Sequence, residues 1–114
     1  MEIIDHTKNN KKIAELNSDT IIIYTAQDAL DLLGNLYYQG YDMIILYAKN
    51  ISSAFYDLKN GLAGEILQKF SNYRMQLSII GDFNNTSSSF QAFMRESNKG
   101  NHVNFSESLC QALT

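Results

Sequence analysis

Short apolar segments alternate with segments of helical periodicity along most of this 114-residue chain, and this alternation constrains its fold more than any other feature. Three apolar blocks, at residues 41–47, 75–80 and 102–105, predict strands. Helical segments run between them, so successive strands must be joined by crossover connections, which are right-handed on steric grounds. Strands joined in this way lie parallel, and the sequence therefore predicts an α/β protein.

The helical segments carry start and stop signals. Thr25 is expected to cap the first helix together with Asp28, and Gly40 is expected to end it. Asp57 is expected to cap a second helix over residues 58–72. A third helix should begin within residues 86–89 and end at Gly100, and a last helix should follow residue 106.

The N-terminal segment predicts a β-hairpin. Two short apolar strings flank Asn9 and Asn10, and asparagine tolerates the left-handed backbone that a tight hairpin turn needs. Residues 20–24 are β-branched and apolar, which indicates either a short strand or a packed connector. The resulting prediction is one domain over residues 1–114: a small α/β sandwich with a mixed sheet of four or five strands and helices on at least one face.

Composition excludes several classes of protein. Hydrophobic residues make up 45% of the chain and charged residues 18%, which is not the composition of a disordered protein. The net charge of −3 provides no field for binding nucleic acid, and the basic residues of the hairpin are expected to form a solvated turn. No apolar run has the length of a membrane span, and the first residues do not resemble a signal peptide, so the expected location is the cytoplasm.

No catalytic, metal or cofactor site is predicted. His6 and His102 show no ligand spacing with each other or with carboxylates, and no nucleotide-binding motif is present. The single cysteine, Cys110, is expected to be a buried, inert thiol on the inner stripe of the last helix. Gly61 and Gly64 are expected inside the second helix, where glycine costs about 1 kcal/mol relative to alanine, so a close approach to the sheet or to a partner is expected to offset them.

The segment DLKNGLAGEILQKF, residues 57–70, resembles the helix start that follows the third strand in the STAS domain, the fold of anti-sigma factor antagonists and of sulfate-transporter tails. The predicted element order is similar over nearly the whole chain. Those antagonists carry a phosphorylatable serine or threonine before the first glycine, whereas Asn60 stands here and cannot accept a phosphate. The chain also resembles a small bacterial family of single-domain proteins without an assigned activity.

The resemblance implies a non-enzymatic interaction or regulatory domain without the phosphorylation switch. The expected partner is a protein or a second copy of the chain, and no cofactor is expected. The predicted interaction surface consists of Phe55, Tyr56, Asp57, Lys59, Asn60, Gly61 and Glu65.

A second hypothesis is a small-molecule-binding or weakly catalytic protein. Open α/β sheets bind ligands at the carboxyl ends of their strands. The predicted pocket is lined by Tyr47, Phe55, Asp82 and Phe83.

Overall fold

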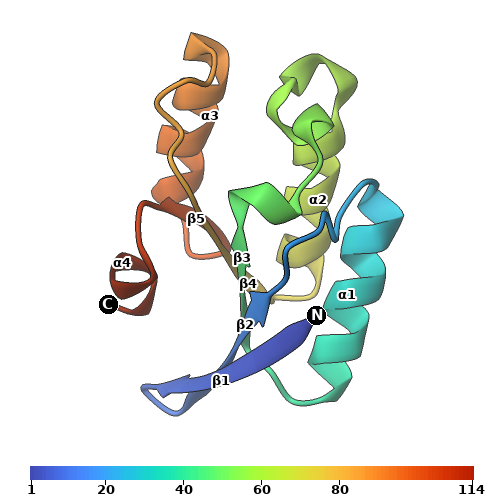
Figure 1. The fold of residues 1–114 in the computed structure, drawn as a ribbon, viewed down its shortest axis with the longest axis vertical. Helices are drawn as coiled ribbons and strands as arrows, with labels where there is room; N and C mark the ends of the chain where they lie inside the picture. The colour runs from blue at the N-terminus through green and yellow to red at the C-terminus, as the bar shows by residue number, and fades with distance from the viewer.

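A five-stranded mixed sheet forms the centre of the computed structural model, which describes residues 1–114 (Figure 1). The strands lie in the order β1-β2-β3-β4-β5; β1 and β2 are antiparallel, and the other neighbouring pairs are parallel. The bounds of the strands are β1 Glu2–Lys8, β2 Lys11–Asn17, β3 Met43–Tyr47, β4 Gln76–Ile80 and β5 Val103–Ser106. The α/β class, the N-terminal hairpin and the parallel crossovers predicted from the sequence are confirmed.

The hairpin turn forms where the sequence predicts it. Asn9 and Asn10 have φ angles of 52° and 67°, the left-handed pair that a two-residue hairpin turn requires. Lys8 and Lys11 lie directly opposite each other on the two sides of the turn. The turn therefore fixes the register that decides which side chains of β1 and β2 face each side of the sheet.

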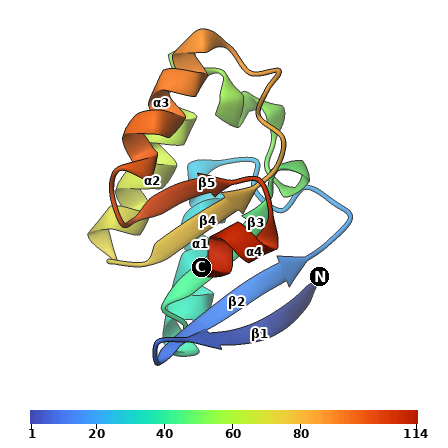
Figure 2. The ribbon, with the colours of Figure 1, turned by 90° about the vertical axis from the view of Figure 1, so that its left-hand side faces the viewer.

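Helices α1, α2 and α3 all pack on one face of the sheet. Because the parallel strands follow one another in sequence order and the crossovers are right-handed, each connecting helix falls on the same side. Figure 2 shows the short helix α4 in front of the sheet, α1 behind it, and α3 above β5 in front of α2. The bounds are α1 Ala26–Tyr38, α2 Leu62–Asn72, α3 Ser88–Asn98 and α4 Leu109–Leu113.

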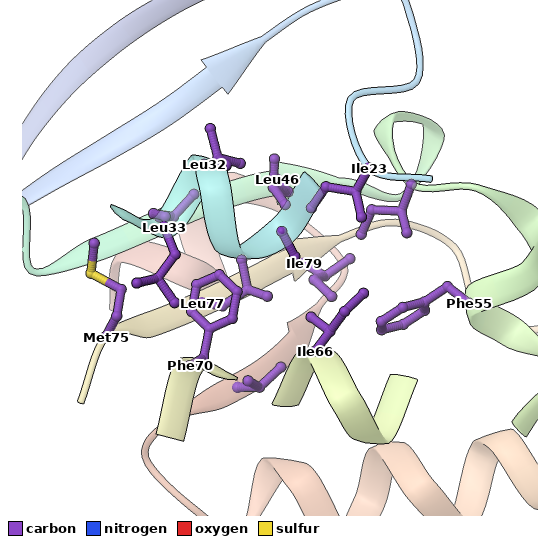
Figure 3. Packing of buried hydrophobic residues seen from close by; sticks show 14 of the residues in the cluster. Ile23, Leu32, Leu33, Leu46, Phe55, Ile66, Phe70, Met75, Leu77 and Ile79 are labelled. Atoms are coloured by element: carbon purple, nitrogen blue, oxygen red, sulfur yellow. The ribbon is translucent and has the colours of Figure 1, made fainter. Parts of the chain in front are cut away.

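The main core lies between the sheet and these helices and contains 22 buried residues (Figure 3). Leu33 from α1 and Phe70 from α2 meet Leu77 and Ile79 from the inner strand β4. Each fully buried side chain of this kind contributes about 1.5–3 kcal/mol relative to exposure, so this face holds most of the apolar stabilisation. The Cα radius of gyration is 13.0 Å. No helix combines the length and the apolar character that crossing a bilayer requires.

The starts of two helices differ from the prediction. Asp57 caps a 3-10 turn, η3 (Leu58–Asn60), by accepting a hydrogen bond from the Lys59 N–H at 3.2 Å, and α2 begins only at Leu62. The last helix is capped by Ser108 rather than Ser106. Asp57 closes an earlier turn, and Ser106 is still part of β5, so a capping residue type alone does not fix where a helix starts.

Residues 20–24 form a connector and not a strand. Ile23 makes one isolated parallel bridge with Ile51. The main-chain oxygen of Asn50 accepts hydrogen bonds from the N–H groups of Ile22 and Ile23. A separate strand would need a continuous ladder, which this segment does not form. The β-branched sequence is explained by burial, because Ile23 is packed in the main core.

Candidate functional site

The second face of the sheet is only partly covered. Residues such as Ile13, Ile45 and Ile80 alternate with the core residues of β2–β4 and point away from α1–α3. Leu109, Ala112 and Leu113 of α4 pack against this small apolar cluster. We call this side the open face, since α4 covers its apolar centre and leaves polar side chains on either side.

A cavity of about 330 Å³ lies on the open face between α4, the hairpin tip and the amino-terminal halves of β3–β5. Its volume is at the lower end of the range of about 300–1,000 Å³ for small-molecule sites. Polar side chains dominate the wall, and four lining residues are hydrophobic. The lining residues are Lys8, Asn9, Lys11, Ile13, Met43, Gln76, Leu77, Ser78, Asn104, Ser106, Gln111, Ala112 and Thr114.

Ser78 is the most informative residue of this wall. It lies in the inner strand β4, between Ile45 and Asn104 on the neighbouring strands, and only 1% of its surface is exposed. Its hydroxyl has no hydrogen-bond partner, and no other buried side-chain nitrogen or oxygen is left unpaired. An unpaired buried polar group costs about 1–3 kcal/mol. The hydroxyl is therefore free to bond with a group inside the cavity.

Two ammonium groups lie at the hairpin side of the cavity. Lys11 Nζ donates to Gln76 Oε1 at 3.4 Å, and Lys8 Nζ donates to the Thr114 main-chain oxygen. The ion pairs of the structure join other residues, so neither lysine is paired with an aspartate or glutamate. No acidic side chain lines the cavity. The charge at this site is therefore positive, although the chain as a whole is acidic.

A separate polar cluster lies on the open face at β1–β3. Glu15 is buried, and its carboxylate accepts hydrogen bonds from Tyr47 Oη at 2.7 Å and from His6 Nε2 at 2.8 Å. Burial, the hydrogen bond to Glu15 and the charge of Glu15 raise the pKa of Tyr47 to about 12. Each carboxylate oxygen already has a partner, so the cluster links three strands and does not provide an unpaired group for a ligand.

The structure divides the predicted interaction surface into a buried and an exposed part. Phe55 is fully buried in the main core, so its side chain cannot contact a partner. Tyr56 is half-buried; it donates to the Ala48 main-chain oxygen at 3.3 Å, and burial raises its pKa to about 12. The remaining predicted residues are exposed together at η3 and the first turn of α2: Asp57, Lys59, Asn60, Gly61 and Glu65.

The alternative pocket does not form from the residues expected to line it. Tyr47 faces Glu15 on the open face, whereas Phe55 and Phe83 belong to the opposite, helix-covered side. There Phe83 packs edge-to-face on Phe105 at 5.4 Å between ring centroids, so aromatic rings fill the space. Asp82 is exposed and accepts a hydrogen bond from the Asn84 N–H at 3.0 Å. Because side chains alternate between the two faces along β3, Tyr47 points to the open face and away from Phe55 and Phe83.

The expectation of a buried Cys110 is wrong. Its thiol is exposed, because α4 presents Leu109, Ala112 and Leu113 to the sheet and turns Cys110 outward. His102 is exposed at the start of β5, far along the sheet from the hydrogen-bonded His6. No three side chains of His, Cys, Asp or Glu are grouped as metal ligands would be.

The close approach to the sheet expected at Gly61 and Gly64 is not found. A Cβ atom at either position would meet no atom within 4 Å, so neither glycine allows a close approach within the molecule. Gly61 precedes α2 with a φ of 77° and serves as its N-cap residue, and Gly64 faces an open groove between α2 and α3. Backbone conformation explains Gly61; nothing in the structure explains Gly64.

The sequence contained a signal for the polar residues of the open face that our prediction did not use. Ser78 interrupts the apolar run of β4, and Glu15 interrupts that of β2. A polar residue inside a strand predicted to be buried on both faces must find a partner or face a cavity. The spacing alone does not say which of these happens, since the partners come from other strands.

The fold and the cavity define a small α/β protein with one helix-covered face and one partly open, polar face. Residues 8–114 match the family described as a domain of unknown function, DUF4180, and the chain belongs to this family. Comparisons with curated proteins and with solved structures gave no significant match. These comparisons provide no link to the STAS family, and the family that is shown has no stated activity.

Proposed function

We propose that this protein is a small-molecule-binding domain whose site is the cavity on the open face. The observation that carries the proposal is the unpaired, buried hydroxyl of Ser78 on the cavity wall. Buried polar groups without a partner are rare in folded proteins, and a bound ligand is one way to supply the missing partner.

The cavity has the mixed wall that ligand sites commonly have. Apolar contact comes from Ile13, Met43 and Ala112, which belong to the apolar cluster of the open face, and hydrogen-bonding side chains surround them. Three structural units contribute to the wall: the hairpin, the sheet and α4. A ligand held there would bridge elements distant in the sequence and would stabilise the folded state by mass action.

The test compares Ser78→Ala with Ser89→Ala, an exposed serine on α3. Without ligand, Ser78→Ala should raise the free energy of unfolding by about 1 kcal/mol in urea denaturation, because an unpaired hydroxyl is removed. Ser89→Ala should change it by less than about 0.5 kcal/mol. A loss of about 1 kcal/mol or more in Ser78→Ala would show that the hydroxyl is satisfied in the free protein and would overturn the proposal.

A protein-interaction role at the exposed residues of η3 and α2 is the second candidate. The STAS-like element order motivates it, and the loop is held in a defined conformation. Asn60 Nδ2 donates to the Ala54 main-chain oxygen at 2.8 Å, and Asn60 Oδ1 accepts from the Leu62 N–H at 2.9 Å. A loop ordered before binding loses less conformational entropy on contact with a partner.

Photo-crosslinking in cells tests this candidate. A photoreactive residue at position 59 should form a defined covalent product, and the same residue at position 35, exposed on α1, should not. Products of equal yield at both positions, or no product at position 59, would remove the interaction candidate.

A further inference from the structure

We infer that the cavity on the open face binds an organic anion, a carboxylate or phosphate monoester carried on a small apolar body. This inference rests on the proposed ligand-binding function and names the class of ligand. Its basis is the joint presence in one cavity of two ammonium groups without an acidic side-chain partner, an unpaired buried hydroxyl and apolar side chains.

The charges around the cavity come from the hairpin alone. β1 provides Lys8 and β2 provides Lys11; the lining residues from β3, β4, β5 and α4 are all uncharged. Lys12, the next residue of the hairpin, lies 4.2 Å from the Tyr41 ring centroid and does not line the cavity. Two of the three lysines in this segment therefore face the cavity, which favours a negatively charged occupant.

The nearby carboxylates are engaged elsewhere. Glu15, on the same face, is bonded to His6 and Tyr47, and Glu2 accepts a hydrogen bond from Asn17. Glu107 precedes α4 and lines a different surface depression, near Asp82. No acidic side chain is therefore paired with the two lysines, and an external anion would exchange only with the bonds from Lys8 to the Thr114 main-chain oxygen and from Lys11 to Gln76.

The position of Ser78 complements that of the lysines. The lysines lie at the hairpin side of the cavity, and Ser78 lies on the inner strand β4 at its floor, so an anionic group and a second hydrogen-bonding group can be bound together. A serine hydroxyl can donate to an anionic oxygen or accept from a ligand N–H or O–H. Ile13 and Met43 provide apolar contact for the body of the same molecule.

The experiment uses four ring-matched probes and the isotope-labelled full chain, observed by NMR at low ionic strength. Benzoate and phenyl phosphate are the anions, benzamide is the neutral control and benzylamine is the cationic control. At least one anion should shift the amide resonances of Ser78 and Asn104 and should bind at least tenfold more tightly than benzamide. Added salt should weaken binding of the anion, because exposed charges are screened.

Matched lysine variants locate the charge. Lys11→Gln should weaken binding of the anion at least threefold and leave that of benzamide unchanged. Lys59→Gln, on the distant η3 loop, should leave both unchanged. Comparison of benzoate with phenyl phosphate shows which anionic group the site prefers.

The outcomes separate the inference from the proposed function. If benzamide or benzylamine shifts the cavity resonances as strongly as the anions do, the cavity is a ligand site but the anion inference is wrong. The inference is also overturned if Lys59→Gln no longer binds the anion more tightly than benzamide, or if Lys11→Gln keeps the full preference for the anion. If none of the four probes shifts the cavity resonances, both the site and its ligand class are rejected.

Discussion

Three glycines near the ends of elements illustrate how differently one residue type can be used. Gly61 has a φ of 77°, a left-handed backbone conformation that is strained for any residue with a Cβ atom. Gly64 is in α2 with open space where its Cβ would be. At Gly81, after β4, an added Cβ would lie 2.7 Å from the Cβ of Ala48, closer than real contacts allow. Only Gly81 permits the close approach that we expected at the other two positions.

Alanine substitution should separate these three roles. Gly64→Ala should raise the free energy of unfolding by about 0.5–1 kcal/mol, because alanine costs less conformational entropy in a helix. Gly61→Ala should lower it by about 1 kcal/mol through left-handed backbone strain, and Gly81→Ala should lower it by about 1–3 kcal/mol through overpacking. Urea denaturation measures all three; a destabilised Gly64→Ala would restore the packing explanation for that position.

Asn60 shows why a sequence resemblance does not transfer a mechanism. The sequence resemblance alone places it at the position of the antagonists' phosphorylated residue, and the comparisons give no link to that family. In this structure its amide connects Ala54 to the start of α2 and so has a structural use. The side chain shapes a loop and cannot carry a regulatory phosphate.

At the scale of elements, one buried asparagine in the segment after β3 holds the connection between β2 and α1. No sequence pattern indicates this contact. Asn50 ends η1 (Ala48–Asn50) and is fully buried. Its Nδ2 donates to the main-chain oxygens of Ser18 and Thr20, both at 2.9 Å. Its own main-chain oxygen accepts from the Ile22 N–H at 2.7 Å. The segment between β2 and α1 is thereby fixed against the end of β3.

Asn50→Ala should therefore destabilise the protein by about 1–3 kcal/mol, since it leaves main-chain acceptors without their donor. Amide hydrogen exchange should become faster around Ile22 and Ile23, whose N–H groups bond to Asn50. Asn35→Ala, at an exposed position on α1, is the matched control and should change stability by less than about 0.5 kcal/mol. Equal effects of the two variants would contradict this assignment.

Helix α4 depends on tertiary contact more than the other helices do. It spans Leu109–Leu113, too short to be stable alone in water. Its packing on the apolar centre of the open face both stabilises the helix and completes the wall of the cavity. The ligand site therefore depends on an element whose own sequence signal is weak.

At the scale of the whole molecule, three tyrosines with raised pKa values make the free energy of unfolding depend on pH in the alkaline range. The pKa values of Tyr47 and Tyr56 are each about 12, against an ordinary value of 10.0. The hydrogen bond to Asp5, burial and the charge of Asp5 also raise the pKa of Tyr41. Between pH 10 and 12 the unfolded chain releases these protons while the folded chain keeps them. Their contribution to stability is thus complete below about pH 10 and is lost as the pH rises towards 12.

The free energy of unfolding should accordingly decline between pH 10 and pH 12, the ordinary and raised pKa values of Tyr47. Tyr47→Phe should make this decline less steep, because one group that titrates differently in the two states is gone. Tyr38→Phe, at a position that is 91% exposed, should leave the slope unchanged. Denaturant unfolding at several pH values, with tyrosinate absorbance as a second signal, measures the effect; equal slopes in both variants would refute it.

The sequence by itself determined the turns and helix ends that depend on bonds between residues close together in the chain. The asparagine turn of the hairpin, the capping box of Thr25 and Asp28 and the end of α1 before Gly40 each depend on bonds within a few residues. The alternation of apolar blocks with helical segments then determined that the later strands lie parallel, because a helical crossover brings the chain back in the same direction. The order of the strands in the sheet came only from the structure.

Only the tertiary structure decided which side chains are buried, paired or free. Phe55 is in the core, Cys110 is outside it, and Ser78 lacks a partner because of residues distant in the chain. The same holds for the cavity, whose wall combines the hairpin, three further strands and α4. Burial and hydrogen-bond satisfaction are properties of contacts between elements, and local sequence chemistry does not specify those contacts.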